Sequence, residues 1–230
     1  MKLHVHESGA GEKVALLIHG GMSDHRTWHA VEDDLLRRGY RVIAPDLRGH
    51  GLSPRGAYTP EALGDDLAEN LPAHADLAIG HSLGGLSLAL AVERLQPRRA
   101  VYSDPGFTLD ALPEQALAFM RQMVATATAD GVREMNPRWP QSDIEAELAG
   151  FALFDAGFLD GVRGFEGRYL PDKAAVPSLV QLADPSLTVS PETAAELERR
   201  GFEIRVVAGA GHCVHRDDLA GFMASLEGWI

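Results

Sequence analysis

Cysteine and lysine are scarce in this chain of 230 residues. The single cysteine, Cys213, excludes an internal disulfide framework and is typical of a protein from a reducing compartment. Lysine occurs only at Lys2, Lys13 and Lys173. This scarcity argues against chemistry that depends on a lysine side chain, although Lys173 keeps a non-hydrolytic carbon–carbon lyase open as an alternative.

Long apolar runs are absent as well. Residues 1–6 contain no apolar stretch of the length that a signal peptide needs, and no run reaches the roughly 20 residues of a membrane-spanning helix. The formal net charge of −12 argues against nucleic acid and anionic membranes as partners. We therefore expect a cytoplasmic protein that acts on a small molecule, without cofactor or metal ion. Self-association into a homo-oligomer stays open.

The length and a hydrophobic content of 45% fit one α/β domain that buries a full core. Apolar segments with the character of buried strands alternate with amphipathic segments, after a short edge strand at 3–6. The expected strands are 14–18, 41–44, 76–79, 100–103, 178–182 and 202–207, and the expected helices are 24–38, 59–71, 83–95, 190–200 and 217–229. This alternation predicts a parallel sheet with helices on both faces.

The alternation stops between residues 107 and 172. This stretch is rich in phenylalanine and methionine, and the spacing of Ser142 and Glu145 predicts a capped helix start. We predict a small helical cap at 107–172 and a core domain formed by 1–106 and 173–230. Phe151, Phe154 and Phe158 are candidates for lining a substrate pocket under the cap.

A sharp turn between a strand and a helix is the strongest functional signal. Residues 80–84 follow the pattern Gly-x-Ser-x-Gly, directly after an apolar strand and directly before a helix. Such a turn holds its serine in a strained conformation, with the side chain exposed at the sheet edge. Gly80 and Gly84 leave room for the tight turn. Ser82 is therefore predicted to be a nucleophile.

A second glycine-rich loop, residues 19–22, follows another central strand. Such a loop can turn a backbone N–H group towards the nucleophile. We expect the N–H groups of Gly21 and Leu83 to hold a developing oxyanion, with Met22 as the alternative to Gly21.

Four segments, 16–20, 46–53, 80–85 and 209–212, stand in the order found in the α/β-hydrolase family, which this chain resembles over nearly its whole length. The resemblance implies a mostly parallel sheet with helices on both faces and a cap between the family's sixth and seventh strands. It also implies a triad in the order nucleophile, acid, histidine. His212, in the glycine-rich loop after the last strand, is the expected base. The charged loop 46–53 is expected to be structural.

The acid departs from the family pattern. Its usual position, in the loop after the seventh strand, falls on Ser186. Asp184 is two residues earlier and serves if the loop is shorter, whereas Asp104 ends the sixth strand, where some members carry the acid. We favour Asp184 slightly and keep Asp104 as the alternative.

Serine at the elbow favours acyl transfer to water. We expect a serine hydrolase, similar to carboxylesterases and lactonases, that cleaves a small, largely apolar ester, lactone or thioester through an acyl-enzyme. A ligand-binding or receptor protein on a hydrolase scaffold, with a slow or idle triad, is the alternative from another class, because fold does not fix function. The arginines of the predicted cap are candidate ligands for a substrate carboxylate.

Overall fold

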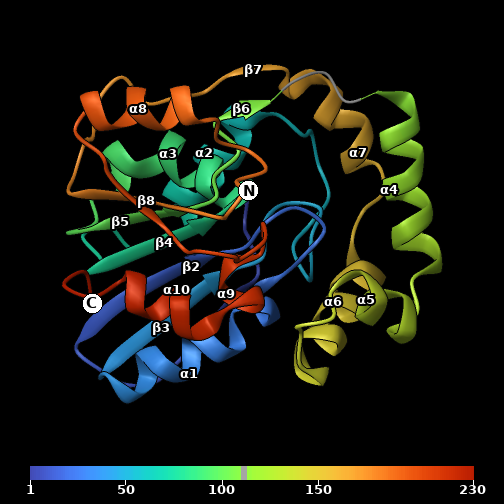
Figure 1. Cartoon of the computed structure of the whole chain (residues 1–230), viewed down its shortest axis with the longest axis horizontal. Helices are drawn as coiled ribbons and strands as arrows, with labels where there is room; N and C mark the ends of the chain where they lie inside the picture. The colour runs from blue at the N-terminus through green and yellow to red at the C-terminus, as the bar shows by residue number, and fades with distance from the viewer. Residues whose placement is uncertain (110–112) are drawn as a thin grey trace.

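A seven-stranded sheet forms the centre of the molecule in the computed structural model, which describes residues 1–109 and 113–230 (Figure 1). Its order is β1-β3-β2-β4-β5-β8-β9, and only β1 runs antiparallel to its neighbour. The strands are β1 (Val5–Ser8), β2 (Lys13–Ile18), β3 (Tyr40–Pro45), β4 (Leu77–His81), β5 (Ala100–Ser103), β8 (Ser178–Leu182) and β9 (Glu203–Val206). The predicted α/β fold with a mostly parallel sheet is confirmed.

Helices cover both faces of this sheet (Figure 1). On one face lie α1 (His29–Arg37), α9 (Val214–Asp217) and α10 (Leu219–Ser225), with the short η1 (His25–Trp28) leading into α1; on the other lie α2 (Pro60–Asn70), α3 (Leu83–Leu95) and α8 (Pro191–Arg199). Thr59 and Ser190 cap α2 and α8, each followed by a proline at the first helical position. Within the two described ranges, no helix is long and apolar enough to cross a membrane.

The sheet separates two hydrophobic clusters. Successive residues of β2 point to opposite sides, so Leu16 and Ile18 pack towards α2 and α3, while Ala15 and Leu17 pack towards α1 and α10. All four side chains are fully buried. This burial on both faces explains why the central strands are continuous apolar runs in the sequence.

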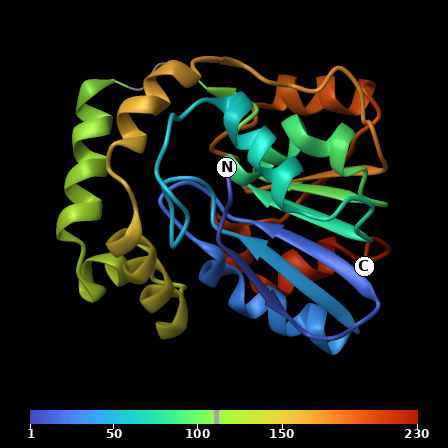
Figure 2. The same cartoon turned by 180° about the vertical axis from the view of Figure 1, so that it is seen from behind.

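Between β5 and β8 the chain forms a helical segment, residues 107–172, which lies to one side of the sheet (Figures 1 and 2). Its elements are β6 (Thr108–Leu109), α4 (Glu114–Thr126), α5 (Ala129–Met135), α6 (Gln141–Leu153), α7 (Phe158–Gly161), η2 (Val162–Phe165) and β7 (Gly167–Arg168). β6 and β7 pair antiparallel where the segment leaves and rejoins the core. Residues 110–112 of the predicted cap lie outside the described residues. The division into two domains stays a prediction.

The start of α6 differs from the expected capping box. The helix begins at Gln141 after Pro140, and no side chain caps it. Glu145 instead accepts a hydrogen bond from the side chain of Gln141, at 3.0 Å. The prediction of a capped start at Ser142 was wrong because the helix begins at Gln141, two residues earlier than a Ser142 cap requires, which takes Ser142 into its first turn.

One buried arginine ties α6 to the loop after β9. The guanidinium of Arg216, in α9, lies 3.4 Å from the ring centre of Trp139. It donates to the carboxylate of Glu147 and to the backbone oxygen of Asp143, both at 2.7 Å. Such a guanidinium is well matched to an aromatic face and to several acceptors at once. The helical segment and the core are therefore joined by a buried polar contact as well as by apolar packing.

Candidate active site

The turn at residues 80–84 connects β4 to α3 and has a strained centre. Ser82 has φ 50° and ψ −114°, a conformation that residues other than glycine rarely adopt. A Cβ atom on Gly80 would lie 2.4 Å from the oxygen of Gly84, and one on Gly84 would lie 2.3 Å from the oxygen of Ile18. Both contacts are with backbone, so only glycine fits at these two positions. The turn therefore fixes Ser82 at the carboxyl end of β4.

Three side chains from different loops form a hydrogen-bonded row at this edge. Ser82 Oγ lies 3.0 Å from His212 Nε2, and His212 Nδ1 lies 2.6 Å from Asp104 Oδ2. An ionised carboxylate can only accept, so Nδ1 carries the imidazole proton and donates it to Asp104. His212 Nε2 is then free to accept the proton of the Ser82 hydroxyl. This is the arrangement that makes a serine nucleophilic.

Asp104 follows β5 and is fully buried. Its other carboxylate oxygen accepts the hydroxyl of Ser186 at 2.5 Å and the N–H group of Ala183 at 3.2 Å. Burial alone would raise the pKa of Asp104, but the hydrogen bonds from His212 and Ser186 outweigh burial and lower that pKa below its usual value. The carboxylate therefore stays ionised at neutral pH.

The preference for Asp184 as the partner of His212 was wrong. The exposed carboxylate of Asp184 accepts the N–H group of Gly209 at 3.2 Å, and it is Asp104 that meets His212. The loop after β8 contributes a hydroxyl, that of Ser186, to the same carboxylate. The residue at the position where the family usually has its acid thus donates a hydrogen bond to the carboxylate that follows the neighbouring strand, β5.

Two more histidines, His81 and His215, lie close to the loop that carries His212. His81 Nε2 donates to the backbone oxygen of His212 at 2.9 Å, and burial lowers the pKa of His81 to about 3. His215 is buried and stacks on Trp28, with ring centres 4.1 Å apart. Burial raises the pKa of Cys213 to about 12, which agrees with a packing role.

The loop 46–53 is held by its own polar groups, as expected for a structural loop. The buried side chains of Arg48 and Asp66 form an ion pair at 2.6 Å. His50 Nδ1 donates to the backbone oxygen of Arg48 at 2.9 Å, and burial lowers the pKa of His50 to about 3. His50 therefore stays neutral in the folded protein at neutral pH.

An apolar cavity of about 160 Å³ opens beside Ser82. The described residues of its lining include no charged side chain. They are Gly21, Met22, Ser82, Leu83, Leu86, Gly106, Leu109, Met120, Phe158, Leu159, Val162, Phe165 and Thr188. Gly21 and Leu83 thus border the same space as Ser82. Leu83 is the first residue of α3, so its N–H group has no acceptor within the helix.

The three phenylalanines expected at a pocket have different surroundings. Phe158 lines the cavity beside Ser82. Phe151 packs with Val132 and Trp139 in a separate cluster, and Phe154 packs on the ring of His50, with ring centres 4.9 Å apart. Only Phe158 of the three borders the cavity, so the assignment of Phe151 and Phe154 to its lining was wrong.

A larger groove of about 1290 Å³ adjoins this cavity and shares Leu109, Met120 and Val162 with it. It continues along residues 182–191. Within 1–109 and 113–230, no lysine or arginine lines the groove or the smaller cavity. Arginines of the helical segment instead pair with acidic side chains, as Arg121 does with Asp160 and Arg163 with Glu114. The lining therefore offers no cation for a substrate carboxylate.

A model of the alpha/beta hydrolase family matches residues 15–224, which include every segment of this site. The chain belongs to the alpha/beta hydrolase family. The sequence resemblance is thereby confirmed, and the family match supports a hydrolase. In this alpha/beta hydrolase, the acid candidate nearest the histidine comes from the loop after β5.

The similar proteins match either nearly the whole chain or a large part of it. An uncharacterised protein of Mycobacterium tuberculosis is 28% identical over 261 residues, covering 96% of this chain and 75% of the relative. The pimeloyl-(acyl-carrier protein) methyl ester esterase of Aromatoleum aromaticum is 33% identical over 146 residues, which cover 61% of this chain and 56% of the esterase. An esterase structure from Exiguobacterium antarcticum superposes with a TM-score of 0.78 at 16% identity, over 99% of this chain and 94% of the esterase chain. At this identity the similarity is one of fold.

Proposed function

We propose that this protein is a serine hydrolase that cleaves a small, largely apolar ester, lactone or thioester through an acyl-enzyme. The observation that carries the proposal is the hydrogen-bonded row from Asp104 through His212 to Ser82, with heavy-atom distances of 2.6 and 3.0 Å. Both distances lie within the range needed for proton transfer in a triad.

In the first half of the reaction, His212 Nε2 takes the proton of Ser82 while Oγ bonds to the carbonyl carbon of the substrate. Asp104 stabilises the imidazolium that forms. The N–H groups of Gly21 and Leu83 hold the negative oxygen, each worth about 3 kcal/mol in the transition state. His212 then gives its proton to the leaving alkoxide or thiolate. In the second half, His212 takes a proton from a water molecule while the water oxygen bonds to the acyl carbon. His212 then returns this proton to Ser82 Oγ as the acyl–Oγ bond breaks, and the carboxylic acid product leaves.

The substrate class follows from the cavity beside Ser82. Its volume of about 160 Å³ and its lining by Leu86, Phe158 and other apolar groups support a small apolar group next to the reacting carbonyl. The names of two similar proteins, a methyl ester esterase and an esterase, support an ester bond in particular.

The features that suggested the two alternative functions, a receptor and a carbon–carbon lyase, no longer support them. A receptor with an idle triad was suggested by the serine at the usual acid position, but Asp104 supplies the carboxylate to His212. A carbon–carbon lyase was kept open by Lys173, whose side chain is exposed and borders neither cavity. Hydrolysis of an ester-type bond is therefore the function we propose.

The test combines a covalent label with turnover. A fluorophosphonate should label one site, Ser82, and short-chain p-nitrophenyl esters, lactones and thioesters should reveal the preferred bond. Ser82→Ala should abolish labelling and turnover, whereas the control Ser87→Ala, one turn further along α3, should keep both. Labelling that persists in folded Ser82→Ala would refute the proposal.

We also propose a cytoplasmic protein that acts on a small molecule without nucleic-acid or membrane partners, for the reasons of charge and composition given above. Fractionation of the source cells tests the location, and gel filtration of the purified protein with light scattering tests self-association. Recovery in the membrane fraction would contradict this part of the proposal.

A further inference from the structure

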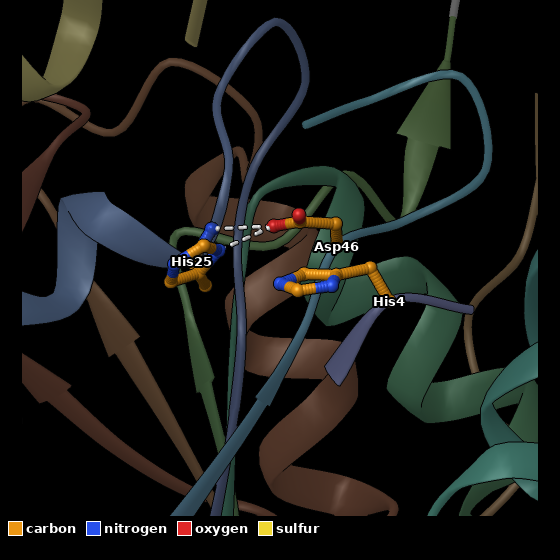
Figure 3. Close-up of side chains that lie close together, drawn as sticks. All are labelled: His4, His25 and Asp46. Carbon is orange, nitrogen blue, oxygen red and sulfur yellow. Dashed lines mark hydrogen bonds and ion pairs between the residues drawn. The ribbon is translucent and has the colours of Figure 1, made fainter. Parts of the chain in front are cut away.

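Two histidines and an aspartate from three separate segments meet at the edge of the sheet near β1 (Figure 3). His4 directly precedes β1, His25 opens η1, and Asp46 directly follows β3. One potential ligand atom from each residue lies within 4.8 Å of those from the other two. None of the three residues belongs to the proposed triad or lines the cavity beside Ser82.

Their donor atoms suit a transition-metal ion. Imidazole nitrogens and a carboxylate oxygen are ordinary ligands of Zn²⁺, at about 2.0–2.2 Å, which sets neighbouring ligand atoms about 3.3 Å apart. His25 Nδ1 already lies 2.8 Å from Asp46 Oδ1, so only His4 has to move closer. His4 is only partly buried and precedes the strand, so a change of side-chain rotamer can bring it there.

Backbone N–H groups hold the carboxylate of Asp46 in place. Asp46 is fully buried, and its two oxygens accept the backbone N–H groups of His25 and Leu52, at 3.0 and 2.9 Å. These bonds fix the carboxylate without using the imidazole rings. Hydrogen bonds that orient a ligating carboxylate in this way are typical of protein metal sites. The side chain of His25 is 16% exposed, which leaves a path for an ion from solvent.

We propose that His4, His25 and Asp46 form a binding site for a divalent transition-metal ion, Zn²⁺ being the best match, with water completing a tetrahedral shell. This revises the expectation of a metal-free protein. The ion replaces the proton that His25 Nδ1 donates to Asp46, so affinity should rise with pH. It would join β1, the loop after β2 and the end of β3. The site is independent of the proposed ester hydrolysis.

The sequence carries a signal for this site in the spacing of two histidines near the N-terminus. His4 and His6 are two residues apart at an edge strand, so both rings lie on one face. His6 stacks on His25 with ring centres 4.9 Å apart, although its Nε2 is paired with Glu32 at 2.9 Å. His6 is therefore a neighbour of the site and, in our proposal, not a ligand.

The experiment is a Zn²⁺ titration of the chelator-treated full-length protein by calorimetry, with Co²⁺ absorption as a second readout. We expect one Zn²⁺ per chain and the visible absorption bands of tetrahedral Co²⁺. At 100 times the dissociation constant, Zn²⁺ should raise Tm by about 5–10 °C. His4→Gln and His25→Gln should each weaken binding more than about 100-fold, since outer-shell changes alone cost about 10–100-fold.

Three variants control for binding elsewhere. His74→Asn removes an exposed imidazole from a loop position with φ 62°, which asparagine tolerates, and should leave the affinity unchanged. His6→Gln and His212→Ala should also bind normally. Zn²⁺ binding no tighter than about 1 mM, or tight binding that survives in His4→Gln and is lost in His212→Ala, would overturn the proposal. His4→Gln keeps the test valid if His25→Gln does not fold.

Discussion

The substitution Asp104→Asn tests the most unusual part of the proposed triad. In the wild-type protein, the carboxylate of Asp104 accepts the proton on His212 Nδ1 at 2.6 Å. An amide at this position keeps its oxygen on the side of Ser186 and Ala183, where two donors already point. Its NH₂ group then faces Nδ1. Two donors would then face each other, so the imidazole proton moves from Nδ1 to Nε2. A protonated Nε2 cannot accept the proton of Ser82.

We expect kcat to fall by up to about 10⁴-fold, which corresponds to about 5.4 kcal/mol of transition-state stabilisation. KM should change little, because Asp104 does not border the cavity beside Ser82. The rate of fluorophosphonate labelling should fall together with kcat, since both depend on the nucleophilicity of Ser82. The assay is steady-state hydrolysis of the best p-nitrophenyl ester, with circular dichroism to confirm the fold.

Asp184→Asn is the matched control. Its carboxylate is exposed and accepts one backbone N–H group, from Gly209, which an asparagine oxygen can also accept. We expect kcat within about twofold of wild type, as for an ordinary surface change. If Asp104→Asn retained kcat within tenfold of wild type while Asp184→Asn lost it, the assignment of the acid to Asp104 would be refuted.

Three further predictions concern neighbouring groups. Ser186→Ala removes one hydrogen bond from the carboxylate of Asp104 and should lower kcat about tenfold at unchanged KM, because a hydrogen bond to a charged group contributes about 1.5–3 kcal/mol. An unchanged kcat would show that the hydroxyl of Ser186 stabilises only its own loop. Phe158→Leu should raise kcat/KM for longer acyl chains relative to acetyl esters, whereas Phe151→Leu should alter only Tm; equal effects of both variants on the substrate profile would contradict this. The pKa of His50 is about 3 in the folded protein and about 6.5 in the unfolded chain, so the unfolded chain binds the proton first as pH falls. The free energy of unfolding should therefore fall by about 1.6 kcal/mol between pH 6.5 and 5 because of His50. Urea unfolding should show a weaker pH dependence in His50→Asn than in wild type or in the exposed control His74→Asn; identical slopes would count against it.

Most of the fold was predictable because the pattern that encodes it is local. The central strands are apolar on both faces, and helix starts such as Thr59 followed by a proline carry their own signals. Element ends were less predictable, since they depend on tertiary contacts. The expected helix at 24–38 divides into η1 and α1, and the expected last helix at 217–229 is the shorter α10, at Leu219–Ser225.

The site was only partly predictable, because its members meet through tertiary structure. The strained turn at Ser82 has a sequence signature, and so does the loop of His212. The choice between Asp104 and Asp184 has none, since both follow strands that end at the same edge of the sheet. The choice depends on how the loop 183–189 folds over Asp104, where the hydroxyl of Ser186 donates a hydrogen bond to the Asp104 carboxylate. No periodicity or spacing encodes that contact.

The Arg216 contact with α6 has a consequence for how substrate reaches Ser82. Arg216 lies four residues after His212, and its guanidinium is buried among Asp143, Glu147 and Trp139. Swinging α6 outwards as a lid would separate the guanidinium of Arg216 from Asp143 and Glu147 and would pull on the loop that carries His212. The large groove meets the cavity beside Ser82 at β6 and α4, a route that leaves the contacts of Arg216 intact.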